Sequence, residues 1–348
     1  MVQVPSGPVR PEVTLLDAAH AQNKPISKRR EISVGGRRIK TIDIHAHCAI
    51  PEAMALHGDK FNGQTRGQAQ QIIVIEERLS SMNEQGIDME ALSINPFWYR
   101  NNDRDKVTEL IRIQNEKLAE ICAKNPDRFV AFASLARQYP DRAGQQRETA
   151  VKKLGLRGAA IGGSVGDDEF ANPKFHPVWA KAQELDVTLF IHPQSTPQLA
   201  SRFKGNGWLS NVIGNPLDTT IALQHLIFEG TLDKFPRLKV CAAHGGGYLG
   251  SYAPRSDHGC FISPQNCDPN IVLKKKPTEY LKQLYFDALV FTPEALRHLV
   301  AQVGASQVVI GTDHPIPWEE HPVDHIMSTP ITDAQKVAIL GGNAARLL

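Results

Sequence analysis

Four short apolar segments of the chain end in side chains that can bind a metal ion or transfer a proton. The first ends Asp43-Ile44-His45-Ala46-His47, with polar residues at alternate positions. In a β-strand, side chains alternate between two faces, so Asp43, His45 and His47 would share one face. Two neutral imidazoles on one face are good ligands for zinc-like ions. Asp43 could be a carboxylate that orients a ligand rather than a ligand itself.

The other three segments each end in one further residue of this kind, namely His192, His244 and Asp313. Each also has a purely structural interpretation: a core histidine, a support for the glycine turn 245–247, and a helix cap. A pair of histidines two residues apart is weak evidence by itself. Four strand ends with the same chemistry are harder to explain by independent structural roles. The pattern therefore predicts a metal site.

The segments that carry these residues fit the strands of a (β/α)8 barrel. Eight β-branched or aromatic-rich runs alternate with helix-like segments, and the C-terminal ends of barrel strands converge on one mouth. A doubly wound open sheet is the alternative, but a glycine-rich phosphate loop would normally follow its first strand. The predicted strands are 40–45, 91–95, 129–135, 156–162, 188–192, 238–244, 284–290 and 308–313. The predicted helices include 76–85, 106–124, 173–185, 218–233 and 293–303.

The first forty residues differ from the rest of the chain. They carry several prolines and a basic cluster at 28–30, without a sustained apolar period. We predict that residues 1–40 form an arm over the surface that ends in a β-like stretch near 31–34. Residues 41–348 would then form a single barrel domain, since barrels reach this size.

Two connections are too long to be simple links between elements. Residues 48–66 follow the first predicted strand and residues 199–215 follow the fifth. Long loops of this kind usually shape the mouth of a barrel. The aromatic residues at 97–99 and Trp208 would either line a wall for a planar substrate or pack in the core.

Composition and charge exclude several classes of protein. The 348 residues include 39 Lys and Arg against 37 Asp and Glu, and 41% are hydrophobic. This balance excludes a disordered chain and a charge-driven nucleic-acid binder. No apolar run approaches the roughly 18 residues of a membrane span, so we expect a cytoplasmic protein with no membrane or nucleic-acid partner. The five cysteines are odd in number and mostly scattered, and predict neither a disulfide framework nor a metal knuckle.

Taken together, the motifs resemble those of the amidohydrolase superfamily. The similarity is to its branch of metal-dependent decarboxylases, which includes aminocarboxymuconate-semialdehyde decarboxylase, and it extends from residue 40 to the C-terminus. One departure is His314, because several relatives have an aromatic residue there. The matching segments are IDIHAH (42–47), IHP (191–193), FPRLKVCAAHGGG (235–247), Arg255, YFDALVFT (285–292), GTDHP (311–315) and GGNAARL (341–347).

The resemblance implies a ligand set of His45, His47, His192 and Asp313 for one divalent ion, with zinc favoured and manganese the alternative. Binuclear relatives carry a bridging lysine at the end of strand four. The segment 156–163 has no lysine at its end, which favours a mononuclear site. His314, His321 and His325 are expected to be solvated or structural, and are not assigned to the metal.

The resemblance also implies roles beyond metal binding. His244 would be an acid–base residue near the metal, and Arg255 would bind a substrate carboxylate across the interface of a homodimer. Asp287 matches a family carboxylate of less certain role. The choice between His244 and Asp313 as the group that handles the proton stays open.

The expected activity is nonoxidative decarboxylation of a small aromatic or muconate-type carboxylic acid. A lactonase or amidase on the same barrel would use the same ligands and is the main alternative. A hydratase and a catalytically inactive barrel are more distant possibilities.

Overall fold

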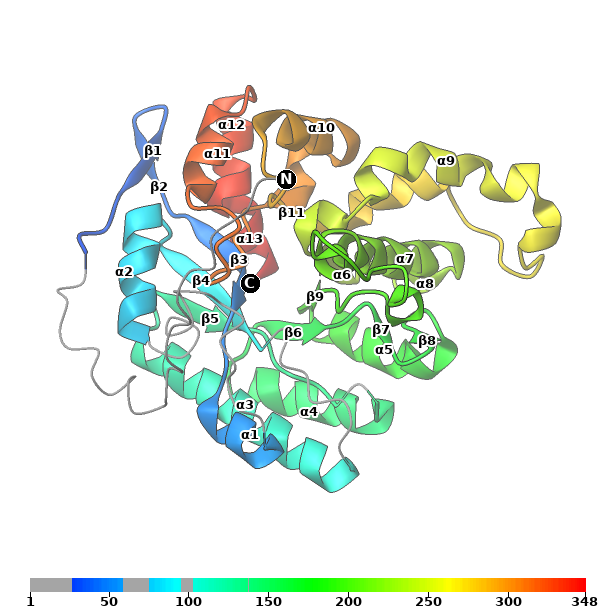
Figure 1. Ribbon diagram of the computed structural model, residues 1–348, viewed down its shortest axis with the longest axis horizontal. Coiled ribbons are helices and arrows are strands. Elements are labelled where there is room, and N and C mark those ends of the chain that lie inside the picture. The colour runs from blue at the N-terminus through cyan, green and yellow to red at the C-terminus, as the bar shows by residue number, and fades with distance from the viewer. Residues whose placement is uncertain (1–26, 59–74, 95–102, 137) are drawn as a thin grey trace, which may run out of the picture.

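The computed structural model describes residues 27–58, 75–94, 103–136 and 138–348. Within these ranges, eight parallel strands lie at the centre of the molecule and helices surround them (Figure 1). The strands form two sheets, of orders β3-β4-β5 and β12-β11-β10-β9-β6. Their bounds are β3 (Ile42–His47), β4 (Met89–Ser93), β5 (Phe129–Ala131), β6 (Gly158–Ile161), β9 (Thr188–Ile191), β10 (Lys239–Ala242), β11 (Leu284–Asp287) and β12 (Val308–Val309).

Two parallel bridges join the sheets into a closed barrel. Ala133 pairs with Ala159, which links the end of β5 to β6, and Ala46 in β3 pairs with His314 beyond β12. All eight predicted strands are therefore present, and the (β/α)8 prediction is confirmed. The observed strands are mostly shorter than predicted, because several of the residues that follow them turn into the loops of the barrel mouth.

Two apolar layers hold the barrel together. One cluster takes side chains from every strand or its immediate end, and only the barrel interior can bring these together. The other packs strand residues against the surrounding helices. The interior cluster includes Ile44, Ala91, Phe132, Ala160, Phe190, Cys241, Val309 and the partly buried Tyr285, and it continues to Ala344 and Leu347 in the last helix.

The helices mostly start and end where local chemistry predicts. The Asp103 side chain caps the helix after it by accepting from the Lys106 N–H (2.9 Å), and Thr292 caps the helix that begins at Pro293. The predicted helix 218–233 is instead broken near Gly230, whose φ of +69° a helix cannot continue. The helices are α1 (Pro51–His57), α2 (Ile75–Gln85), α3 (Arg104–Lys124), α4 (Pro140–Lys152), α5 (His176–Glu184), α6 (Leu209–Val212), α7 (Gly214–Phe228), α8 (Thr231–Lys234), α9 (Leu249–Ile262), α10 (Pro293–Val303), α11 (Pro322–Ser328), α12 (Asp333–Val337) and α13 (Asn343–Leu347).

The described part of the N-terminal arm lies against the barrel helices. Strands β1 (Ile32–Val34) and β2 (Arg37–Ile39) form an antiparallel hairpin, which confirms the predicted β-like stretch. The Ser27 hydroxyl donates to the Ser80 carbonyl of α2 (2.8 Å), and Arg30 pairs with Asp324 of α11. The rest of the predicted arm, residues 1–26, lies outside the described residues.

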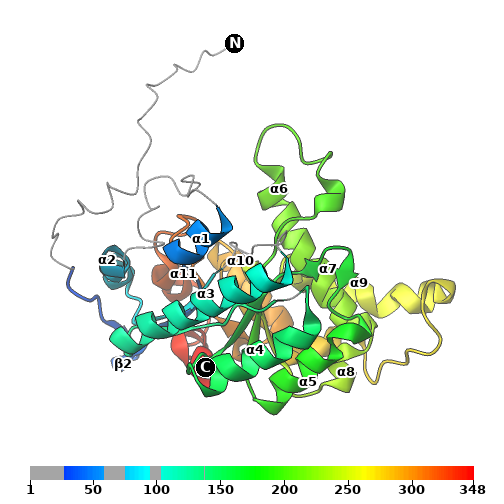
Figure 2. The ribbon, with the colours of Figure 1, turned by 90° about the horizontal axis from the view of Figure 1, so that it is seen from below.

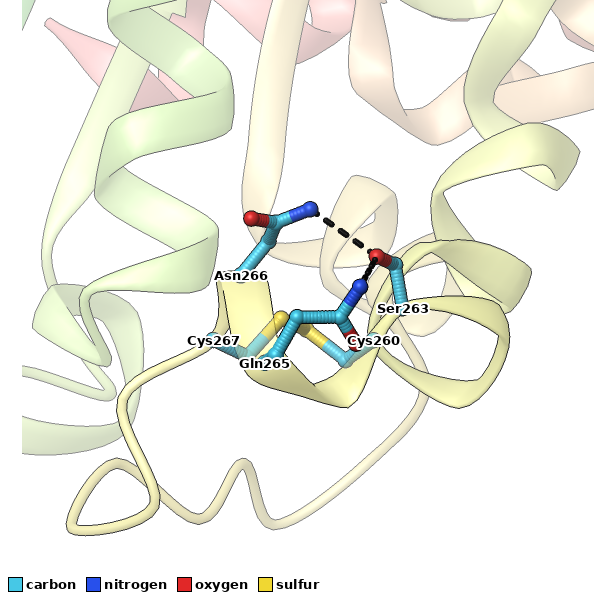
Figure 3. The surroundings of a disulfide bond; sticks show 5 residues. All are labelled: Cys260, Ser263, Gln265, Asn266 and Cys267. Carbon is cyan, nitrogen blue, oxygen red and sulfur yellow. Dashed lines mark hydrogen bonds between the residues drawn. A yellow bond between two sulfur atoms is a disulfide. The ribbon is translucent and has the colours of Figure 1, made fainter.

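One disulfide corrects the expectation drawn from the cysteines. Cys260 near the end of α9 is bonded to Cys267, whereas the other three cysteines are free. The chain turns back after α9 through a short 3-10 helix (Pro264–Asn266), which brings two cysteines seven positions apart together. Side-chain amides of this turn donate to the Ser263 hydroxyl (Figure 3). This disulfide sits on the segment that extends furthest from the barrel in Figure 1.

A separate finding concerns membranes: none of the helices in the described ranges is long and apolar enough to cross one.

Asp88 makes a testable contribution to stability at the N-terminal end of β4. Its buried carboxylate accepts from the Thr41 N–H (2.8 Å) and from Arg38 (2.5 Å). Burial alone would raise the pKa of Asp88, but the bonds from Arg38 and Thr41 hold that pKa below its ordinary value. The stabilisation is thus complete above the unfolded-state pKa of about 4 and is lost as pH falls through the folded-state pKa.

We therefore predict that Asp88→Asn lowers the free energy of unfolding by about 1–3 kcal/mol at pH 7, because the Arg38 guanidinium loses its counter-charge. The difference in unfolding free energy between the variant and wild type should narrow below about pH 4. Urea unfolding of both proteins at pH 7 and at pH 3 measures this difference. Asp127→Asn is the control, because this carboxylate is 74% exposed and 3.6 Å from Arg29. A difference that does not change with pH would contradict the assignment.

Candidate metal centre

The C-terminal ends of three barrel strands bring the predicted ligands together. His45 and His47 end β3, His192 follows β9, and Asp313 lies in the loop after β12. His244, which directly follows Ala243 after β10, joins them. All are buried except the His244 side chain, which is 14% exposed.

The Asp313 carboxylate lies at the centre of this group. Its Oδ1 lies 3.0 Å from His45 Nε2 and 3.8 Å from His192 Nε2, and it is hydrogen-bonded to His47 Nε2. Its Oδ2 lies 3.9 Å from His244 Nε2. Ligand atoms of His45, His192, His244 and Asp313 all lie within 4.8 Å of one another. The structure thus brings every predicted ligand and His244 into one cluster.

Two of these residues have a backbone conformation that L-amino acids rarely adopt. The φ angles of His244 and Asp313 are +56° and +61°, and such residues concentrate at functional sites. The glycines after His244 allow its turn to pack closely. A Cβ on Gly247 would lie 2.0 Å from the Pro216 carbonyl oxygen of α7. The turn is therefore held in place by backbone contact as well as by hydrogen bonds.

The electrostatics of the cluster fit a cation. Burial alone would lower the pKa of His45, but the Asp313 and Asp287 carboxylates raise it to about 10. Burial would raise the pKa of Asp313, yet His47 and His45 keep it well below its ordinary value, so this carboxylate is ionised. Burial lowers the pKa of His47. A divalent ion would replace the proton on His45 as the charge that balances Asp313.

Unsatisfied nitrogen atoms support the same fit. In the described part of the chain, no hydrogen bond of acceptable geometry is found for two buried nitrogens, His45 Nε2 and His47 Nδ1, and this is costly for a polar group. His45 Nε2 faces the Asp313 carboxylate, so both offer lone pairs to the same point. Imidazole nitrogen and carboxylate oxygen are ligands that zinc and manganese both accept. The cluster is a site for one divalent metal ion.

Asp287, predicted with an uncertain role, orients the ring of the predicted ligand His45. Its Oδ2 lies 2.7 Å from His45 Nδ1 and accepts from the His244 N–H (2.9 Å), and its Oδ1 accepts from the Gly245 N–H (2.9 Å). Accepting from Nδ1–H leaves Nε2 of His45 as the lone-pair nitrogen aimed at the cluster. The signal in the sequence was an acid at the end of a strand.

Asp43 does not share the histidine face as predicted. Its carboxylate accepts from the His45 N–H (2.9 Å) and the Thr312 hydroxyl (2.6 Å), and therefore fixes backbone rather than an imidazole ring. The physical reason is a shift of the β3–β4 register between Asp43 and Ala46, which interrupts the strict alternation of faces.

The three histidines not assigned to the metal lie outside the cluster. His314 is buried with Nδ1 2.6 Å from Glu90 Oε1, so the structural interpretation is confirmed and the solvated one is wrong for it. His325 is buried 3.5 Å from Glu319, and His321 is exposed. The sequence reasoning missed Glu90 and its partner Arg78, because their spacing to the ligands carries no signal.

Arg255 and Trp208 have surface positions. Arg255 lies exposed on α9, and no contact with the cluster is found in the described part of the chain. Trp208 is 58% exposed and stacks on Trp318 with ring centroids 5.6 Å apart, while Phe291 lies 6.2 Å from Trp318. Trp208 therefore does not pack in the core. Its loop carries α6 and projects from one end of the barrel (Figure 2). Residues 97–99 lie outside the described ranges.

A cavity of about 540 Å³ lies near the ends of β6 and β9, and none of the residues that line it belongs to the cluster. Its walls include Gly163, just beyond β6, and Gln194, two residues after His192. This volume suits a small organic ligand.

Comparison with known proteins decides the family. The model of the amidohydrolase family matches residues 42–348. The chain belongs to this family. It is 30% identical over 320 residues to a gamma-resorcylate decarboxylase of Rhizobium radiobacter, with 88% of this chain and 97% of the relative covered. It is 29% identical over 313 residues to 2-amino-3-carboxymuconate-6-semialdehyde decarboxylase of Dictyostelium discoideum. This match covers 88% of this chain and 84% of the relative.

A solved structure adds a metal to the comparison. It is a dihydroxybenzoic acid decarboxylase from Polaromonas sp. JS666 with bound manganese and the inhibitor 2-nitroresorcinol. The TM-score is 0.77 and the identity 28%, with 89% of this chain and 96% of that chain covered. The matched family and fold confirm the expectations from the sequence, and the manganese of this neighbour is the alternative to the zinc that was favoured.

The role of Asp287 can be tested through metal affinity. Asp287→Asn should weaken Mn²⁺ binding by about 10–100-fold, because an amide cannot accept from the His45 ring and both backbone N–H groups as a carboxylate does. Titration of the metal-free protein with Mn²⁺ measures this. Asp257→Asn is a matched control, since Asp257 accepts two bonds from Thr278 outside the cluster. Equal affinity in the Asp287 variant and wild type would remove the orienting role.

Proposed function

We propose that this amidohydrolase is a metal-dependent, nonoxidative decarboxylase of a small aromatic or muconate-type carboxylic acid. The observation that carries the proposal is the convergence of four metal-ligand side chains and His244 at one barrel mouth. The ligands would be His45, His47, His192 and Asp313. Decarboxylase relatives that cover most of the chain support this activity over other activities of the same fold.

The chain's own residues account for the steps of such a reaction. A bound divalent ion supplies Lewis-acid polarisation of an oxygen next to the carboxylate. Within the cluster His244 has the exposed imidazole, so it can reach a substrate and deliver a proton to the carbon that bears the carboxylate. The bond between that carbon and the carboxylate then breaks and CO₂ leaves. The electron pair of the broken bond stays on the substrate and restores its conjugation. Asp313 is the alternative proton handler.

Removal of the metal is the first test. We expect metal-free protein to release no CO₂ from hydroxybenzoic and muconate acids, and Zn²⁺ or Mn²⁺ to restore release. Zinc is the ion we favour, and elemental analysis of the purified protein identifies the resident one. Ring-opening or amide cleavage without CO₂ would instead support a lactonase or amidase. Absence of metal after reconstitution would overturn the proposal.

The role of His244 separates catalysis from metal binding. His244→Ala should keep one metal per chain while turnover falls by about 100-fold or more, as expected for loss of an acid–base group. Metal analysis and a CO₂-release assay on the same sample measure both. His225→Ala on α7 is the control, because in the described ranges His225 pairs with the carboxylates of Glu169 and Glu229, away from the cluster. Loss of metal from the His244 variant would make His244 a ligand.

Arg255 leads to a prediction about assembly. We infer a homodimer in which α9 of one subunit presents Arg255 to the substrate carboxylate of its partner, since a guanidinium fork suits a carboxylate. In support, this segment exposes large apolar side chains, among them Phe261, which is 81% exposed. Arg255→Ala should raise the Michaelis constant, and light scattering should give twice the chain mass. A monomer would remove this arrangement.

Two further predictions accompany the proposal. The division into an arm at residues 1–40 and one barrel domain at 41–348 stays a prediction, supported by the family match that begins at residue 42. A cytoplasmic location likewise stays a prediction, and fractionation of cells that express the chain would test it.

A further inference from the structure

A second group of buried charged and polar side chains lies directly behind the metal centre. It comprises Arg78 of α2, Glu90 of β4 and His314 of the loop after β12. Arg78 and Glu90 have no exposed surface, and His314 is 3% exposed. Arg78 Nη1 donates to Glu90 Oε2 (2.7 Å), and Glu90 Oε1 lies 2.6 Å from His314 Nδ1. One carboxylate thus ties a helix to a loop.

This group contacts the two elements that carry His47 and Asp313. The Arg78 Nη2 group donates to the carbonyl of His47. His314 adjoins Asp313 in the chain, and its own carbonyl accepts from the His47 N–H (2.6 Å). A closed ring of bonds therefore runs from His47 through Arg78, Glu90 and His314 back to His47.

Stability alone does not account for such a group. Replacing a buried ion pair by apolar side chains of similar size is often neutral or stabilising, because desolvation offsets the attraction between the charges. What the ion pair and its hydrogen bonds add is direction, since a guanidinium fork holds two acceptors in a fixed geometry. Here the two acceptors are the Glu90 carboxylate and the backbone of a predicted ligand.

We propose that Arg78, Glu90 and His314 are positioning residues of the metal centre. Their network fixes the end of β3 against the loop after β12 and so sets where the His47 ring meets the Asp313 carboxylate. None of the three belongs to the predicted ligand set or to the group of candidate ligand atoms around Asp313. The inference rests on the proposed metal-dependent function.

The same strand supplies a matched control. Asp88 and Glu90 are both buried carboxylates of β4 or its start, and both bind an arginine. Asp88 lies with Thr41 at the start of β3, whereas Glu90 connects to the strand end that carries His47. Asp88→Asn and Glu90→Gln each replace a buried carboxylate that pairs with an arginine by the corresponding amide. The two positions differ in whether their contacts reach the strand end that carries His47. Both should lower the melting temperature.

The test measures Mn²⁺ affinity and the electron paramagnetic resonance spectrum of bound Mn²⁺ in the full chain. Glu90→Gln should weaken Mn²⁺ binding by about 10–100-fold and alter the spectrum, whereas Asp88→Asn should leave both unchanged. Arg78→Lys keeps the positive charge without the guanidinium fork and should also weaken Mn²⁺ binding. It is the substitute test if the Glu90→Gln variant does not fold.

Two results would overturn the proposal. Wild-type Mn²⁺ affinity and spectrum in a folded Glu90→Gln or Arg78→Lys variant would remove the positioning role. Equal loss of affinity in Asp88→Asn would show that general destabilisation is the cause. Failure of the decarboxylase proposal is distinguishable, because wild type would then bind Mn²⁺ and release no CO₂, while the comparison of affinities would still stand.

Discussion

The backbone junction between the first and last strands of the barrel holds the metal centre together. The Asp313 N–H donates to the His45 carbonyl (2.9 Å), and the His47 N–H donates to the His314 carbonyl. These bonds close the barrel and place the carboxylate among the imidazoles at the same time. Without them, His47 would lose its acidic partner and His45 would keep only Asp287, and the buried charge on Asp313 would be uncompensated. The same backbone bonds therefore close the barrel and assemble the site.

Around that junction, carboxylates divide the work of orientation. Asp287 holds the His45 ring and the turn that carries His244. Asp43 accepts from the His45 N–H and from the Thr312 hydroxyl, and so connects β3 to the loop after β12. Each acid accepts several N–H or O–H donors, which makes it rigid. These acids thus fix the His45 ring and the backbone on which the cluster is built.

Much of this arrangement could be predicted from the sequence, because it follows from the ends of strands. The predicted ligand positions His45, His47, His192 and Asp313 each end a short apolar run, and a barrel brings such strand ends together in a cluster. The face of Asp43 could not be predicted, since a register shift in β3 leaves no mark on the alternation of residue types. The disulfide could not be predicted, because it depends on a turn after α9. The Arg78–Glu90 pair could not be predicted either, because it joins a helix to a strand through packing alone.

The positions of His47 and Asp313 in the chain have a consequence for the order in which the cluster can assemble. They lie 266 residues apart, near the two ends of the barrel. Their contact requires β3 and the loop after β12 to meet, so it forms no earlier than closure of the barrel. A chain that stops before Asp313 would therefore keep the histidines of the cluster and lack its central carboxylate.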